Sequence, residues 1–438
     1  MLKTLQNAFK VKDVRHRIFY VLMMLVVIRI GSQLPVPGVD GSYFKTWFES
    51  QTGDAFNFLD AFTGGSFSQM SIFALSITPY ITSSIIIQLL TIAIPKLEEM
   101  QRDGEDGRKK LGAITRYVTI GLSLFESIAM AIGFGNRGLI PDNNFVKIIV
   151  VVVALTAGSA FLMWVGEQIN EKGVGNGISI VLLINIVSRI PSDMTTLYES
   201  FMKGKIIAKA LLSGVIIAAI IIGVVILVII LNGAERRIPV QYSRKMVGRK
   251  MMGGQSTNIP LKVNTAGVIP IIFASSIMSF PGVIAQFAGK ANGTGIGSEI
   301  LRGLSSSNWC NPSQIKYSWG LLVYVVLCVF FAYFYTSITF NPLEVADNIK
   351  KQGGFIPGIR PGKPTSDYLT KMLNYIIFIG AVGLIIVAVI PFFFNGVFGA
   401  NVSFGGTSII IVVGVVLETV KQIESQLLVR NYKGFLNN

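Results

Sequence analysis

Ten stretches of predominantly apolar residues recur along the chain, and they constrain its fold more than any other feature. Most approach the ~20 residues that an α-helix needs to cross the hydrocarbon core of a bilayer. Lipid offers backbone groups no hydrogen-bond partner, so stretches of this kind indicate helices rather than open sheets. The predicted spans lie at roughly 18–35, 71–94, 112–134, 146–168, 177–191, 206–232, 265–287, 317–339, 371–394 and 406–427.

The composition agrees with an all-α polytopic membrane protein. Of the 438 residues, 51% are hydrophobic and only 14% are charged, whereas a soluble chain is usually about a quarter charged. His16 is the only histidine, and the sequence has no Cys/His cluster, no P-loop and no Gly-rich dinucleotide-binding turn after a strand. We therefore expect that the protein binds no metal and no cofactor and is not an enzyme. Cys310 and Cys328 are a poor basis for a disulfide because Cys328 falls inside a predicted span.

The basic residues are unevenly distributed among the loops. Most of the 38 lysines and arginines precede the first span, follow the second, sixth and eighth spans, or lie in the tail. An even number of spans places both termini on this side, and the positive-inside rule makes it the cytoplasm. The two largest basic loops, 233–264 and 340–370, are open to two interpretations: a solvated cytoplasmic face, or a docking surface for a phosphate-rich or acidic partner.

The two basic loops have distinct local signals. Extended flanks around Gly253-Gly254 predict a projecting ribbon with a basic tip in 233–264. Asn341-Pro342 predicts the start of a helix that should end near Gly353-Gly354. The Pro- and Gly-rich run that follows is unsuited to a helix and predicts a stiff, exposed turn around Arg360.

The two halves of the chain share a short pattern. Pro79 precedes Ser-Ser-Ile in the second span, and Pro270 precedes the same triplet in the seventh. Because these are the second spans of two odd-numbered sets, the halves 1–191 and 192–438 would form a five-plus-five inverted repeat. Chance similarity among apolar helices is the alternative.

Residues 54–95 join a loose run to a long apolar segment. The run Thr63-Gly64-Gly65-Ser66-Phe67-Ser68 is a poor helix former and a natural hinge. Ile81 and Ile85 lie four residues apart, on one helical face of the uncharged segment that follows. A hinged segment leading into a spanning helix fits these residues, and so does the re-entrant loop of any transporter.

Glu126, in the third predicted span, stands out among the ionisable side chains of the spans. An intramembrane carboxylate is by default a candidate functional residue. A protonated or hydrogen-bonded Glu packing against another helix fits equally well.

Three further runs have distinctive sequences: 175–180 (GNGISI), 255–264 (QSTNIPLKVN) and 358–362 (GIRPG). They resemble signature segments of the bacterial SecY family, and the similarity extends from the basic N-terminus to the tail. The resemblance implies a clamshell of ten transmembrane helices in two inverted halves, forming a channel for unfolded secretory polypeptides and releasing membrane segments laterally. The alternative, a secondary transporter on an inverted-repeat scaffold, would need polar or charged side chains near the pore midplane, where this chain would place Ile and Leu.

The resemblance also implies site residues. An aliphatic pore ring would comprise Ile81, Ile85, Ile178, Leu182, Ile272 and Ile411. A plug would cover about 56–71, with its hinge at Gly64 and Gly65; a polar pair, Gln88 and Asn264, would lie at the lateral gate, where we extrapolate that Glu126 joins them.

Further implications concern partners. Arg249, Lys250 and Arg360 would dock the SecA motor or the ribosome. SecE and SecG would be the membrane partners, signal-sequence-bearing polypeptides the substrates, and the lipid bilayer of the bacterial cytoplasmic membrane the setting.

Overall fold

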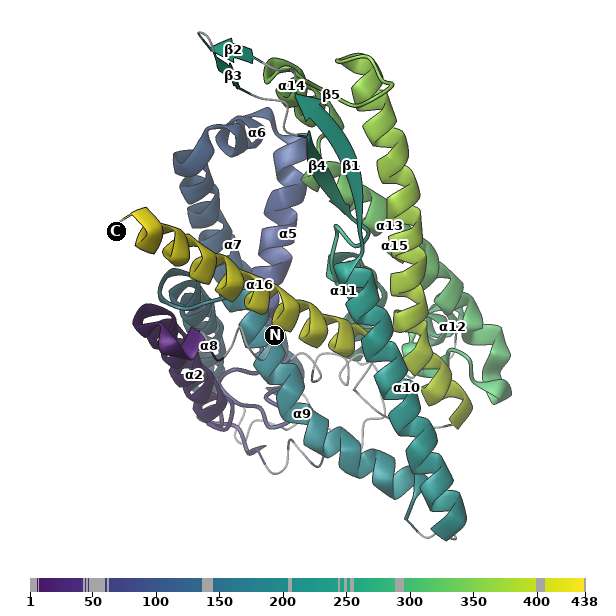
Figure 1. Cartoon of the computed structure of the whole chain (residues 1–438). Coiled ribbons are helices and arrows are strands. Elements are labelled where there is room, and N and C mark those ends of the chain that lie inside the picture. Colours follow the sequence, from purple (N-terminus) through teal and green to yellow (C-terminus); the bar gives the residue numbers. More distant parts are fainter. Residues whose placement is uncertain are drawn as a thin grey trace. The chain divides into compact units, whose positions relative to one another are not determined.

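The computed structural model of this chain is built from long helices with one three-stranded and one two-stranded sheet (Figure 1). The structure describes residues 6, 8–41, 44, 46, 60, 63–135, 145–203, 207–242, 245–247, 250–252, 256–287, 295–398 and 406–436. The chain divides into two compact units: unit 1 is Met1–Thr195, Gly282–Ser298 and Val415–Asn438, and unit 2 is Thr196–Pro281 and Glu299–Gly414. The division into two inverted halves, 1–191 and 192–438, stays a prediction.

Unit 1 contains most of the N-terminal helices. They are α2 (Lys12–Gly31), α5 (Thr78–Ala93), α6 (Pro95–Arg102), α7 (Gly104–Gly135), α8 (Phe145–Lys172) and the larger part of α9 (Gly177–Phe201). α7 packs against both α5 and α8. Beside them Phe44, Phe67 and Phe134 meet edge to face, with ring centroids 4.9–6.3 Å apart, in a core cluster that also buries Met70.

Unit 2 contains most of the C-terminal helices. They are α10 (Ile207–Gly233), the larger parts of α11 (Ile269–Phe287) and α12 (Ile296–Leu304), η1 (Ser306–Asn308), η2 (Pro312–Ser318), α13 (Trp319–Thr339), α14 (Pro342–Lys351) and α15 (Lys363–Phe398). Its core packs Trp309, Tyr324 and Phe392 together, with ring centroids 4.9–5.5 Å apart. α16 (Gly406–Leu436) contributes its first residues to unit 2 and the rest to unit 1.

All ten predicted spans coincide with helices, namely α2, α5, α7, α8, α9, α10, α11, α13, α15 and α16. By length and composition alone, six helices in the described part of the chain are suited to crossing a bilayer, or seven if the bent pair α5–α6 counts as one span. The chain is a mostly helical, multi-pass membrane protein.

The second span differs from its prediction. A helix over 71–94 was expected from the apolar run, but α5 begins only at Thr78, after a series of turns. Met70 and Ser76 have φ of 45° and 52°, and L-residues in a right-handed helix cannot adopt positive φ. The 16 residues of α5 therefore extend only about 24 Å, and α6 continues the chain after a bend of 108°.

The fifth span is longer than predicted. The pattern indicated a short segment at 177–191, yet α9 continues through Pro191 to Phe201. Proline removes one backbone donor and disfavours a helix without forbidding it. The predicted end of this span at residue 191 was therefore wrong, because the helix continues past Pro191.

The predicted ribbon in 233–264 is confirmed. β1 (Glu235–Tyr242) pairs antiparallel with β4 (Ser256–Lys262), and β5 (Gly354–Phe355) pairs with the far end of β1 to give the order β4-β1-β5. β2 (Lys245–Val247) and β3 (Lys250–Met252) form a second antiparallel pair between them in the chain.

An apolar cluster supports this sheet. Ile238, Val240 and Leu261 from the strands pack with Ile349 of α14 and Leu369 of α15, all of them buried. α14 begins as predicted, because the Asn341 side chain accepts hydrogen bonds from the backbone N–H groups of Leu343 and Glu344. The sheet therefore rests on α14 and α15 as one body within unit 2.

Candidate functional site

The glycine-serine run folds into a compact chain of turns. Thr63 Oγ1 donates to the Asp60 carbonyl at 3.2 Å and accepts from the Phe67 N–H at 3.1 Å. Gly64 and Gly65 have φ of 67° and 85°, which only glycine adopts without strain. The predicted plug covers about 56–71, of which the structure describes Asp60 and 63–71; the hinge role of the two glycines stays a prediction.

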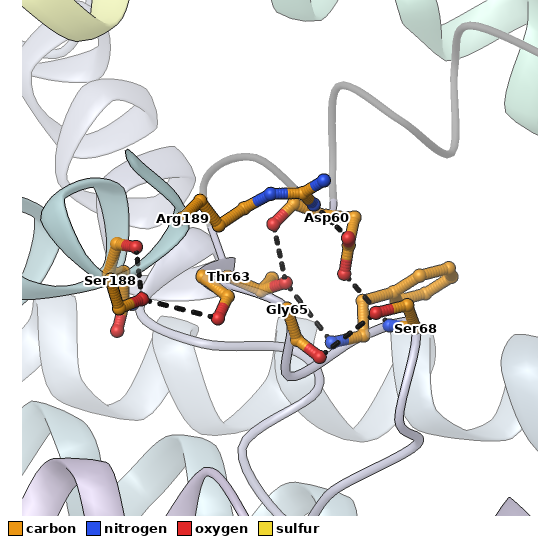
Figure 2. A network of polar contacts seen from close by, with 9 residues as sticks. Asp60, Thr63, Gly65, Ser68, Ser188 and Arg189 are labelled. Carbon is orange, nitrogen blue, oxygen red and sulfur yellow. Dashed lines mark hydrogen bonds and ion pairs between the residues drawn. The ribbon is translucent and has the colours of Figure 1, made fainter. Parts of the chain in front are cut away.

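This run of turns is attached to α9. Figure 2 shows Asp60, Thr63, Gly65 and Ser68 beside Ser188 and Arg189. The Arg189 guanidinium forms an ion pair with Asp60 Oδ2. Ser188 Oγ donates to the Gly64 carbonyl at 3.3 Å.

Close packing explains the glycine at position 64. A Cβ there would lie 2.7 Å from the Asn185 carbonyl oxygen, closer than real Cβ atoms approach. One helical turn away from Ser188 and Arg189, Asn185 Nδ2 donates to Ser76 Oγ at 2.9 Å, and both side chains are buried. α9 therefore holds the turns at two ends, before and after the glycines.

α9 also carries two of the predicted pore-ring residues. Ile178, Leu182, Asn185 and Arg189 follow one another at spacings of four, three and four residues, which places them on one helical face. Leu182 is 7% exposed and Ile178 is half-buried. The face that would contribute to the ring thus continues directly into the residues that hold the run of turns.

The remaining ring residues are divided between the units. Ile81 and Ile85 lie half-buried on α5 in unit 1, whereas Ile272 on α11 is half-buried and Ile411 on α16 is 3% exposed in unit 2. Closure of the six into one ring stays a prediction.

The predicted gate residues differ in their surroundings. Gln88 is exposed on α5, and Glu126 is half-buried on α7. Asn264 is buried, and its Nδ2 donates to Asn232 Oδ1 of α10 at 2.7 Å. The Gln88–Asn264 pair and the place of Glu126 beside it stay predictions.

Arg360 lies in the exposed turn that the sequence predicts. Gly358 and Gly362 on either side have φ of 81° and 100°, and the Arg360 carbonyl accepts from Thr365 Oγ1 at 2.9 Å. Ile356, four residues before Arg360, is buried in the apolar cluster that supports the sheet, so this side chain fixes the start of the turn. Lys250 opens β3, and Arg249 lies outside the described residues.

The ion pair is the feature that sequence reasoning missed. Glu126 was singled out among the ionisable residues of the spans, and Arg189 of the fifth span was passed over. An arginine within a predicted span requires a counter-charge, and that signal was available. The identity of its partner, Asp60, could not be read from the sequence, because the two residues lie 129 positions apart.

The described residues contain no group of three His, Cys, Asp or Glu side chains that could hold a metal ion. Both cysteines are free, and Cys328 is buried in α13.

A mostly helical, multi-pass membrane protein with a run of turns docked on an aliphatic helix is a candidate membrane channel. The SecY family model matches residues 71–420. Protein translocase subunit SecY of Halalkalibacterium halodurans is 43% identical over 443 residues and 100% of both chains. The subunit of the same name from Corynebacterium glutamicum is 43% identical over 454 residues, with 98% of this chain and 99% of its own covered.

Solved structures share the fold. A protein-conducting channel matches with a TM-score of 0.62 at 18% identity, over 94% of this chain and 92% of its own. A structure concerned with the SecY plug domain, which stabilises the closed state of that channel and maintains a membrane seal, matches with a TM-score of 0.60 at 18% identity over the same shares.

The chain belongs to the SecY family. It is a protein-conducting translocation channel and not an enzyme, and the family fold is a clamshell of ten helices. This membership sets aside the secondary-transporter alternative.

Proposed function

We propose that this channel passes unfolded secretory polypeptides across the bacterial cytoplasmic membrane and releases membrane-protein segments sideways into lipid. The full-length similarity to SecY subunits of two bacteria is the observation that carries this proposal. Both termini face the cytoplasm, as the distribution of basic loops indicates.

The proposed seal is aliphatic. Ile81, Ile85, Ile178 and Leu182 of unit 1, with Ile272 and Ile411 of unit 2, form a constriction that excludes water and ions by dewetting. Such side chains offer a passing polypeptide no fixed polar partner, so the chain can slide. The segment of about 56–71, turning at Gly64 and Gly65, closes the pore as a plug.

In the proposed lateral gate, which α5 and α11 would line, Gln88 and Asn264 are the polar pair and Glu126 of α7 joins them. Polar side chains at a lipid-facing seam weaken its closure and favour exchange with a signal sequence.

The channel is a subunit of a translocase complex, with SecE and SecG as membrane partners. Arg249, Lys250 and Arg360 dock the SecA motor or the ribosome. The exposed turn that carries Arg360 supports this role, because a rigid turn loses little conformational entropy when a partner binds. Among the similar structures, canine Sec61 is found in a ribosome–channel complex, with a TM-score of 0.59 at 17% identity over 94% of this chain and 92% of its own.

Site-specific crosslinking tests the channel. One cysteine replaces Ile81 in a variant whose Cys310 and Cys328 are serine, a second cysteine is placed in a stalled secretory substrate, and SecA and ATP are added. We expect a crosslink at position 81. A matched cysteine at Phe125, which is 72% exposed on α7, should give none.

A crosslink of equal yield at both positions, or none at 81 with working SecA, would refute passage through the proposed pore.

A further inference from the structure

We propose that the Asp60–Arg189 ion pair positions the plug against α9 in the closed channel, and that separating the pair is a required step of opening. The inference rests on the proposed function, because it assigns the 56–71 segment the role of plug. The contacts between this segment and α9 would then set how readily the channel opens. The plug anchor is defined here as Asp60, Gly64, Ser188 and Arg189.

Asp60 joins two parts of the plug to α9. Its Oδ1 accepts from the Ser68 N–H at 2.8 Å, across the two glycines, while its Oδ2 faces Arg189 (Figure 2). The Asp60 side chain is 3% exposed and that of Arg189 is 22% exposed. A carboxylate at this depth is costly without its cation, so the plug adopts this position only when Arg189 is present.

The two sides of the glycine turn are held by different forces. After the glycines, Phe67 and Met70 are buried in the apolar core of unit 1. Before Gly65, two polar contacts reach α9: the ion pair of Asp60, and the Ser188 hydrogen bond to the Gly64 carbonyl. A rotation at Gly64 and Gly65 that separates the polar side from α9 therefore also breaks the hydrogen bond from the Ser68 N–H to Asp60 Oδ1, while Phe67 and Met70 stay in the apolar core.

One helical face of α9 connects the anchor to the ring. Arg189 lies on the same helical face as Ile178 and Leu182, about two to three turns further along. A polypeptide that packs against the ring face and rotates or displaces α9 also moves the Arg189 side chain away from Asp60. The ion pair thereby links occupation of the ring to release of the plug.

The test uses the complete translocase in vesicles. Arg189→Gln leaves the internal contacts of the plug untouched, and Asp60→Asn keeps an acceptor for the Ser68 N–H while removing the charge. We expect each variant to raise the resting ion conductance, and the translocation of a substrate with a defective signal sequence, at least about tenfold. Arg189→Lys, which keeps the charge, should stay within about threefold of wild type.

A matched control removes a different ion pair of the same unit. Arg116 Nε lies 2.6 Å from Glu167 Oε1 and joins α7 to α8 without touching the plug. Glu167→Gln should leave both readouts unchanged. Protease resistance of every variant is measured alongside, so that loss of fold is recognised.

The double variant Asp60→Asn with Arg189→Gln decides between a pair and two separate effects. If the residues act as a pair, the double variant matches the stronger single variant within about twofold, because the interaction is already lost. Multiplied effects, or single variants that behave as wild type, overturn the proposal. Should Arg189→Gln fail to fold, Asp60→Asn and Arg189→Lys still give opposite expected results.

The outcome is distinguishable from failure of the proposed function. If the wild-type protein does not translocate a substrate with an intact signal sequence, the channel proposal fails. If it does, and the variants open no more readily than wild type, the anchor alone is refuted.

Discussion

The plug segment and the Arg360 turn use the same backbone device for opposite purposes. Each contains two glycines with left-handed φ, Gly64 and Gly65 in one and Gly358 and Gly362 in the other. In the first, the charged residue Asp60 is turned inward and paired; in the second, Arg360 is turned outward. A rigid turn around a buried charge acts as an internal anchor, whereas the same turn around an exposed charge acts as a recognition element.

The contrast between the two turns fails if Arg360 has no role in translocation. Arg360→Glu should reduce SecA-driven translocation to background, about a hundredfold or more, because a reversed charge at a docking site repels the partner. Translocation rates in reconstituted vesicles measure this, with resting conductance unchanged.

Lys351→Glu is the control for Arg360→Glu. Lys351 is also exposed, at the end of α14, and the substitution changes the net charge by the same amount. Equal loss in both variants, or wild-type rates with Arg360→Glu, would contradict a specific role for the turn.

A second experiment separates the seal from the anchor. Changing Ile81, Ile85, Ile178 and Ile272 together to Ser should make the resting channel leak ions by about tenfold or more, because hydroxyls admit water to an apolar constriction. Single-channel or vesicle conductance measures the leak.

The matched quadruple changes four exposed apolar residues of unit 1 and unit 2 helices, Phe125, Ile132, Ile226 and Phe330, to Ser. These should leave conductance at the wild-type level. An unchanged conductance in the ring variant would count against the ring.

The support beneath the Arg360 turn gives a smaller effect. Ile356→Ala removes a side chain that is 3% exposed, and a cavity of this kind costs about 2–5 kcal/mol. We expect earlier proteolysis of the 340–370 loop and slower SecA-driven translocation, with resting conductance unaltered.

Ile359→Ala, at a half-buried neighbour, should cost less than Ile356→Ala. Conductance that rises together with loop proteolysis would mean that the two regions are not independent.

The smallest expected effect concerns the helix that supports the turn. Asn341→Ala removes the side-chain acceptor at the start of α14 and should cost about 1 kcal/mol. Asn341→Ser keeps an acceptor and should be close to wild type. Hydrogen exchange of the first turn of α14 measures both, and equal protection in the two variants would exclude a capping role.

Apolar runs and local turn chemistry predicted most of the fold. Each span coincides with a helix, and Asn341-Pro342 placed the start of α14 correctly because capping depends on adjacent residues. The start of α5 could not be placed, since Ser71 is held by a bridge to Pro35 that depends on tertiary structure. The Asp60–Arg189 pair escaped prediction for the same reason: nothing near either residue in sequence indicates the other.

The proline within α9 places the plug anchor on a weakened turn of the helix. Pro191 lacks the N–H that would bond the Val187 carbonyl, so the turn from Val187 to Pro191 has one backbone hydrogen bond fewer. Ser188 and Arg189 lie within this turn, whereas Ile178 and Leu182 lie on the regular helix that precedes it. A movement of α9 that starts at the ring is passed along this regular helix, and it reaches the anchor at the turn where the helix bends most easily.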